Sequence, residues 1–333
     1  MSAPLPLADL AHHLQSGDRA ALGRAITLVE SARPADQEHA RALLALCSTP
    51  TTPALRIGIT GIPGVGKSTL IDALGIAVIA AGHRVAVLAV DPSSVRSGGS
   101  ILGDKTRMEG LSRSENAFIR PTPSSGMLGG VARRTRETIL LCEAAGYDLV
   151  LVETVGVGQS ELDVDGMTDL NVLLTIAGAG DELQGIKRGI MESADVIVIT
   201  KGSNVEAKAL AHARHGFANA IPFLPQRDSG RRPDVLVTDA LAGDGITQLW
   251  EHLWKLYTAD RGSGYLQRRR TEQEVHWMEQ AIDEGLRTVL QAEPGMNELI
   301  AAHKDAVRSG SIHALKAAED ILLRFRTGGG RLP

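Results

Sequence analysis

The sequence predicts an α/β fold in which a mostly parallel sheet is covered by helices on both faces. β-Type runs alternate with helical patterns through residues 51–258, and most of these runs are continuously apolar. Continuous apolarity is typical of parallel strands buried on both faces. A glycine-rich phosphate-binding loop, residues 61–69, follows the first run and precedes a helix. Such sheets bind ligands beyond the carboxyl ends of their strands, so we expect the site at that edge.

The individual strands are predicted from short β-branched and apolar runs separated by helical patterns and turns. The phosphate-binding loop comes after the first of them, and an acidic residue lies at or directly after the end of two others. The predicted strands cover residues 56–60, 84–90, 117–120, 149–153, 171–177, 196–200 and 235–238.

Helical segments flank the predicted sheet on both sides. Apolar residues recur at helical spacing in the first 48 residues, and a proline-rich hinge follows at 49–53. Beyond residue 260, segments 266–290 and 296–325 read as helices with no strand. We predict a helical extension over 1–50, a P-loop domain over 51–258 and a helical C-terminal arm over 259–333. For Arg268, Arg269 and Arg270 a solvated helix face is favoured over a basic patch for an acidic partner.

Composition excludes several function classes. The net charge of −4 and the 3% aromatic content argue against a protein that coats nucleic acid. The N-terminus lacks the pattern of a signal peptide, and the longest apolar runs are too short to span a bilayer. We therefore expect a cytoplasmic protein with no membrane partner. Cys47 and Cys142 are far apart and are expected to be buried free thiols.

The phosphate-binding loop has the complete pattern G-x-x-x-x-G-K-[ST]. Its glycines allow successive N–H groups to point inward at a phosphate, and the following helix directs its positive dipole end there. Lys67 supplies a charge for the β- and γ-phosphates, and the Ser68 hydroxyl is placed to ligate Mg²⁺. The predicted nucleotide-binding residues of the loop are Gly61, Pro63, Gly64, Val65, Gly66, Lys67, Ser68 and Thr69.

Three acidic residues complete a predicted phosphoryl-transfer site. Asp91 directly follows the second predicted strand and can reach Mg²⁺ directly or through water. Asp104 lies in a glycine-containing segment, 97–108, of the kind that orders around a γ-phosphate. Glu153 ends a strand three residues before Gly156, whose N–H would sense the γ-phosphate. Because the next glutamine, Gln159, is not adjacent to Gly156, we expect slow intrinsic hydrolysis.

A base-recognition motif is predicted at Thr200-Lys201-Gly202-Ser203. The usual pattern is Asn/Thr-Lys-x-Asp, whose carboxylate accepts from the guanine ring, but here Ser203 replaces the aspartate. Either GTP binds weakly, or a neighbour compensates, or specificity has relaxed. Candidate neighbours are Asn204 and the loop 238–241, which includes Ala240 and Leu241. On this basis, Ser203→Asp is expected to tighten GTP binding selectively over ATP.

In this order and spacing, the motifs resemble the MeaB family, which is ArgK-like and has human relatives such as MMAA. These proteins are G-protein chaperones of adenosylcobalamin-dependent acyl-CoA mutases. The resemblance covers nearly the whole chain. The segments that carry it are 61–69, 91–94, 97–108, 129–133, 153–161 and 178–187.

The resemblance implies a SIMIBI-class P-loop GTPase, akin to signal-recognition and MinD-like proteins, that uses GTP/GDP and Mg²⁺. It implies Mg²⁺ ligands at Ser68, Asp91, Asp104 and Glu153, and catalytic roles for Lys67, Asp104, Glu153 and Gly156. It further implies a homodimer formed by the arm, and a mutase whose cofactor loading the protein gates and which it protects or reactivates. Segment 177–188 would be an extra switch toward that mutase, through Asp181, Gln184 and Lys187.

Three other functions stay open at this point. A P-loop kinase or ATPase would phosphorylate a protein or small-molecule acceptor, although no additional acceptor-binding domain is evident. A metallochaperone GTPase for nickel enzymes would need a metal motif near the loop, and the ten histidines are scattered. A nucleotide-binding scaffold without turnover is compatible with Ser203.

Overall fold

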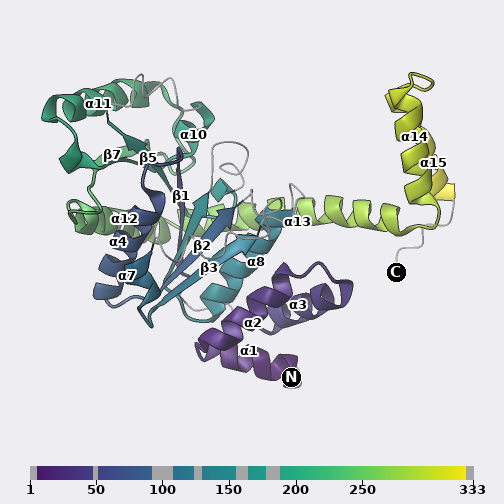
Figure 1. Cartoon of the computed structure of the whole chain (residues 1–333), viewed down its shortest axis with the longest axis horizontal. Helices are drawn as coiled ribbons and strands as arrows, with labels where there is room; N and C mark the ends of the chain where they lie inside the picture. The colour runs from purple at the N-terminus through teal and green to yellow at the C-terminus, as the bar shows by residue number, and fades with distance from the viewer. Residues whose placement is uncertain are drawn as a thin grey trace. The chain divides into compact units, whose positions relative to one another are not determined.

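The computed structural model describes residues 6–47, 52–91, 108–123, 130–154, 164–177 and 188–327. The chain forms two compact units, Met1–Gln273 and Glu274–Pro333. The first contains the sheet and its covering helices, and the second is helical wherever it has regular structure (Figure 1). The division into three parts at residues 50 and 258 stays a prediction.

The first unit is built on a seven-stranded, entirely parallel sheet in the order β3-β2-β4-β1-β5-β6-β7. All seven predicted strands are present, so the predicted fold class is confirmed. β1, β4 and β6 are buried at every position, which explains their continuously apolar sequences. The strands are β1 (Leu55–Gly61), β2 (Val85–Asp91), β3 (Ala117–Pro123), β4 (Leu149–Thr154), β5 (Leu170–Ile176), β6 (Val196–Thr200) and β7 (Asp234–Val237).

Helices cover both faces of the sheet. On one face, α4 (Lys67–Ala80) and α12 (Ile246–Gly262) pack on alternate residues of the central strands, and short α7 (Glu109–Ser112) lies beside α4. On the other face, α8 (Gly130–Ala144) packs on β2, β3 and β4 (Figure 1). That second face is completed near β5, β6 and β7 by α10 (Arg188–Ser193) and α11 (Ala207–Ala220), while η1 (Gly202–Asn204) and η2 (Ile221–Phe223) are single turns.

The N-terminal extension is helical, as predicted. α1 (Leu7–Gln15), α2 (Arg19–Glu30) and α3 (Pro34–Leu46) pack against one another and against α8. Asp18 caps α2 by accepting from the N–H groups of Ala20 and Ala21. Cys142 is buried and Cys47 is only partly buried, and both are free thiols, so the prediction of two buried thiols is right for one of them.

The arm differs from its prediction at one point. α13 (Tyr265–Ala292) is continuous, but the segment predicted as one helix over 296–325 is two, α14 (Met296–Arg308) and α15 (Ala314–Thr327). Gly310 ends α14 in a left-handed conformation, φ 73°. Its N–H donates to Val307 O at 3.1 Å, and the next N–H, of Ser311, donates to Ala306 O at 2.9 Å. This is a glycine-terminated helix end, and the helical spacing of apolar residues on both sides of it concealed the break.

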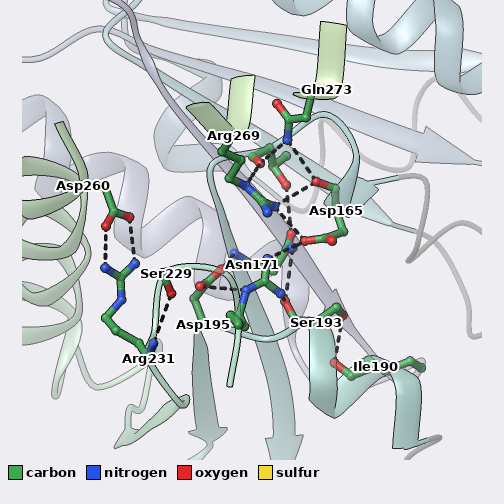
Figure 2. A network of polar contacts seen from close by, with 12 residues as sticks. Asp165, Asn171, Ile190, Ser193, Asp195, Ser229, Arg231, Asp260, Arg269 and Gln273 are labelled. Carbon is green, nitrogen blue, oxygen red and sulfur yellow. Dashed lines mark hydrogen bonds and ion pairs between the residues drawn. The ribbon is translucent and has the colours of Figure 1, made fainter. Parts of the chain in front are cut away.

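The arginine triplet at the start of α13 also differs from its prediction. Arg269 and Arg270 are not on a solvated face, because their side chains are only 11% and 13% exposed. Each pairs with a carboxylate at the amino ends of the strands: Arg269 with Asp165 at 2.8 Å, and Arg270 with Asp169 at 2.6 Å. Figure 2 shows Arg269 and Gln273 of α13 directed at Asp165. Neighbouring Arg268 is exposed, as a solvated face requires.

Within the described part of the chain, the helices are all too short or too polar to cross a membrane.

Candidate nucleotide-binding site

The phosphate-binding loop connects the carboxyl end of β1 to the first turn of α4. Gly61, Gly64 and Gly66 have φ angles of 150°, 79° and 102°. These values are favourable only for glycine, because a Cβ atom would collide with the backbone. At Gly61 a Cβ would also lie 2.7 Å from Leu174 O in β5. The glycines predicted from the motif are therefore required by the backbone conformation and by close packing on the neighbouring strand.

The loop concentrates positive charge at the helix end. Gly66 is the N-cap of α4 and offers no side-chain acceptor, so the first N–H groups of the helix lack a side-chain cap. The buried Lys67 Nζ donates to Gly61 O at 2.6 Å and to Ile62 O at 3.2 Å. These carbonyl contacts hold the ammonium group over the loop. An anion that enters the loop meets both the helix N–H groups and this charge.

A hydroxyl and a carboxylate lie together at the same edge of the sheet. Ser68 Oγ donates to Glu153 Oε1 at 3.0 Å, and Glu153 is 5% exposed. The pairing of β1 with β4, Ile59 opposite Glu153, brings them together. Oxygen donors of these two kinds suit a hard cation such as Mg²⁺. The described residues contain no group of three or more His, Cys, Asp or Glu side chains placed to hold a metal, so Ser68 and Glu153 would form one part of the set.

Asp91 ends β2, beside β4, two residues past Ala89, which pairs with Glu153. Its backbone is thus at the same edge as Ser68 and Glu153. The other predicted metal and catalytic residues, Asp104 and Gly156, lie outside the described residues.

The predicted base-recognition segment is tied to the phosphate-binding loop. Thr200 Oγ1 donates to Val65 O at 2.7 Å, and Lys201 Nζ donates to Gly64 O at 3.0 Å. Among the described residues, Lys201 alone is a non-glycine residue with positive φ, 58°. A left-handed lysine is uncommon, and such conformations concentrate at functional sites. The structure therefore brings together loop 61–69 and residues 200–201, which are far apart in the sequence.

Ser203 contacts Asp239, a carboxylate of the loop 238–241 that the sequence analysis named as a candidate neighbour. Its Oγ donates to Asp239 Oδ2, and its N–H donates to the same oxygen at 3.3 Å. Asp239 Oδ1 accepts from the N–H groups of Leu241 and Ala242, at 3.1 and 3.2 Å. These donors, the Ser203 hydroxyl first, lower the pKa of Asp239 from its ordinary value. A usable signal existed in the sequence, namely an acid just after the strand that neighbours β6.

The predicted partner-coupling residues Asp181, Gln184 and Lys187 lie outside the described residues. The structure brings together the segments 61–69, 200–203 and 238–242. The first contains the predicted residues Pro63 and Thr69, and the last contains Ala240 and Leu241.

The fold and the site together define a P-loop nucleotide-binding protein with its ligand edge at the carboxyl ends of a parallel sheet. Comparisons with known proteins narrow this class. The chain belongs to the MeaB family: the model described as "Methylmalonyl Co-A mutase-associated GTPase MeaB" matches residues 22–295. The resemblance stated from the motifs is thereby confirmed.

Individual relatives agree with this assignment. "GTPase ArgK" of Escherichia coli (strain K12) is 50% identical over 278 residues, 84% of each chain. "Methylmalonic aciduria type A homolog, mitochondrial" of Mus musculus is 43% identical over 324 residues, which cover 94% of this chain and 78% of the relative. A crystal structure titled "LAO/AO transport system kinase" matches with a TM-score of 0.75 and 38% identity, covering 96% of this chain and 97% of that one. The protein is a GTPase.

Proposed function

We propose that this GTPase is a Mg²⁺-dependent switch that acts as a chaperone of a cobalamin-dependent acyl-CoA mutase, gating cofactor loading and protecting or reactivating the mutase. The proposed partner is methylmalonyl-CoA mutase or a relative, that is, a mutase that uses adenosylcobalamin to act on an acyl-CoA. Membership of a family described as mutase-associated supports this partner. The observation that supports the switch is the contact between Ser68 of the phosphate-binding loop and Glu153 near the end of β4.

In this proposal the chain's own residues bind and orient GTP for attack by water. The loop N–H groups and Lys67 bind the β- and γ-phosphates, and Lys67 exchanges its contacts with Gly61 O and Ile62 O for phosphate oxygens. Ser68, with Glu153 and Asp91 directly or through water, would hold Mg²⁺, which neutralises charge on the phosphate oxygens. Water attacks the γ-phosphorus, the bond to the β–γ bridging oxygen breaks, and GDP and phosphate leave.

Hydrolysis is proposed to be slow alone and faster with the mutase. The motif after Glu153 lacks a glutamine adjacent to Gly156 to orient the attacking water. A partner that positions this water, or orders the segments that surround the γ-phosphate, would accelerate turnover. The nucleotide state would in turn change affinity for the mutase, because coupling between two sites is reciprocal.

We further propose that the protein is a homodimer assembled through its arm. In the part of α13 that belongs to the second unit, Val275, Met278, Ile282 and Leu286 are 42–57% exposed. Their spacing of three and four residues places them on one face of the helix, as at a helix–helix interface. A second copy of the chain supplies the same apolar face.

Light scattering tests the dimer. The wild-type protein should have twice the chain mass, and Ile282→Asp should have the mass of one chain. A monomeric wild-type protein at micromolar concentration would contradict the dimer.

The central experiment measures GTP turnover with and without a purified cobalamin-dependent mutase. The expected result is release of free phosphate that requires Mg²⁺ and rises in the presence of the mutase, with Lys67→Ala as the inactive control. No acceleration by any of several adenosylcobalamin-dependent acyl-CoA mutases would contradict the chaperone role. A phosphorylated acceptor in place of free phosphate would indicate a kinase instead.

A further inference from the structure

The loops after β6 and β7 carry a hydroxyl and an acid in an unexpected order. Ser203 occupies the position at which the base-recognition pattern places its carboxylate, and Asp239 lies in the next loop. β6 and β7 are parallel neighbours with Ile199 paired to Val237, so the residues that follow them emerge side by side. Two backbone bonds, Thr238 N–H to Ile199 O at 2.9 Å and Gly202 N–H to Thr238 O at 3.1 Å, join the loops.

The Asp239 carboxylate is fixed in orientation by four donors. The N–H groups of Leu241 and Ala242 hold Oδ1, and they belong to the same turn as Asp239. Ser203 supplies both contacts to Oδ2, one from its hydroxyl and one from its N–H at the long distance of 3.3 Å. Asp239 is 3% exposed in this state. A ligand reaches Oδ2 when the Ser203 side chain turns away about its Cα–Cβ bond, and this side of the carboxylate then exchanges its donors for those of the ligand.

The surroundings of the carboxylate suit a flat ring. Leu241, two residues after Asp239 in the same turn, is 83% exposed and offers an apolar surface there. Lys201 is directed at the phosphate-binding loop through its bond to Gly64 O, which places its Cε 3.9 Å from where a Cβ of Gly66 would be. The turn that holds the carboxylate thus presents an apolar side chain, and Lys201 connects the Ser203 segment to the phosphate-binding loop, as expected of a site for a purine whose phosphates occupy the loop.

We propose that Asp239 is the carboxylate that selects guanine in this protein, and that Ser203 is a positioning residue for it. The acid that reads the base would thus come from the loop after β7 instead of the loop after β6. Guanine offers two donors on one edge, the ring N1–H and the exocyclic amine, whereas adenine presents an acceptor at N1. A carboxylate therefore favours guanine. The inference rests on the proposed GTP site and names the residue that gives that site its base specificity.

This arrangement revises the sequence-based expectation for Ser203→Asp. That substitution would place a second carboxylate against Asp239, and two like charges in contact repel. We therefore expect Ser203→Asp alone to weaken GTP binding, and the double variant Ser203→Asp with Asp239→Ser to restore it.

The first test is Asp239→Asn in the full-length protein, titrated with fluorescent analogues of GTP, ATP and xanthosine triphosphate. Loss of one charged hydrogen-bond acceptor should weaken GTP binding about 10- to 100-fold and leave ATP binding unchanged. Xanthosine triphosphate should bind the variant more tightly than it binds the wild-type protein, because xanthine has a carbonyl in place of the amine and the asparagine amide can donate to it. An unchanged ratio of GTP to ATP affinity would overturn the inference.

Asp244→Asn is the matched control, since Asp244 is an exposed carboxylate of the same loop. It should leave all three affinities unchanged, and an equal loss of GTP binding in this variant would overturn the inference. If Asp239→Asn does not fold, the double variant Ser203→Asp with Asp239→Ser tests the inference instead. The double variant must bind GTP more tightly than Asp239→Ser alone, and failure to do so counts against the inference. Lys67→Ala should lose all three nucleotides, whereas a wild-type protein that binds none would refute the proposed function itself.

Discussion

The two edges of the sheet use similar charged residues in opposite ways. At the amino ends of the strands, buried or partly buried arginines and carboxylates pair with one another. At the carboxyl ends, Lys67 donates to loop carbonyls and Asp239 accepts from a serine hydroxyl and N–H groups. Paired full charges are costly to separate, whereas neutral partners can be exchanged for the polar or charged groups of a ligand. The difference shows which edge stabilises the fold and which is prepared for binding.

At the amino edge the ion pairs connect elements that are distant in sequence. Arg56 of β1 forms a bidentate contact with Glu143 of α8, at 2.9 and 2.7 Å. Arg227 contacts both Asp165 and Asp195, at 2.7 and 3.1 Å. Burial alone would lower the pKa of Arg269, but Asp165, together with Tyr265 and Asp195, more than offsets this effect, and the pKa is raised. The Arg269 guanidinium group therefore stays charged, and the ion pairs of this edge contribute to the stability of the fold.

The largest effect is expected from breaking this buried network. Arg270→Met removes the partner of Asp169, whose side chain is 2% exposed, and should lower the free energy of unfolding by about 3–5 kcal/mol. Urea denaturation measures the change, with Arg268→Met as the matched control on the same helix, expected within about 0.5 kcal/mol of wild type. Nucleotide affinity of the folded protein should be unchanged. Equal stability of the two variants would remove the distinction between the edges.

The reverse pattern is expected at the carboxyl edge. Lys67→Ala should reduce GTP turnover by about 100- to 1,000-fold, the range for loss of one transition-state charge donor. Its thermal midpoint in the absence of nucleotide should stay close to wild type, because the contacts to Gly61 O and Ile62 O are made to neutral acceptors. Phosphate release and calorimetry on the same preparation test both statements. A variant that unfolds instead of losing turnover would mean that the loop lysine is structural.

The smallest effect concerns acid stability. Burial raises the pKa of Asp165, but Arg269 and then Arg227 outweigh it, so the folded-state pKa lies below the ordinary 3.8. The resulting stability is complete above 3.8 and is lost as pH falls through the folded-state pKa. Asp195, which burial shifts upward, contributes in the opposite direction.

Urea denaturation at several pH values below about 5 should therefore show a shallower dependence of stability on pH for Asp165→Asn than for wild type. Asp228→Asn, which removes an exposed carboxylate, controls for the change in net charge. Equal slopes for wild type and Asp165→Asn would show that the arginines do not favour the ionised form of Asp165.

The sequence by itself determined the fold class, all seven strands and the phosphate-binding loop. These features are local. Continuous apolar runs indicate strands that are buried on both faces, and the glycines of 61–66 indicate backbone conformations that are unfavourable for other residues. It also determined the family, because motifs in a fixed order and spacing are readable without coordinates. By contrast, apolar periodicity predicts one helix over 296–325, whereas the structure has two, separated at the glycine of Ser309-Gly310-Ser311.

Only the tertiary structure decided which polar residues meet. Arg269 and Arg270 read as solvated from their sequence neighbours, yet they lie over Asp165 and Asp169, some hundred positions away. The sequence pattern indicates that Ser203 leaves the base-recognition motif without its aspartate, yet the parallel pairing of β6 and β7 brings Asp239 into contact with Ser203. In each case the partner lies on a different element, and strand order and register, which no local pattern encodes, fix the distance between them.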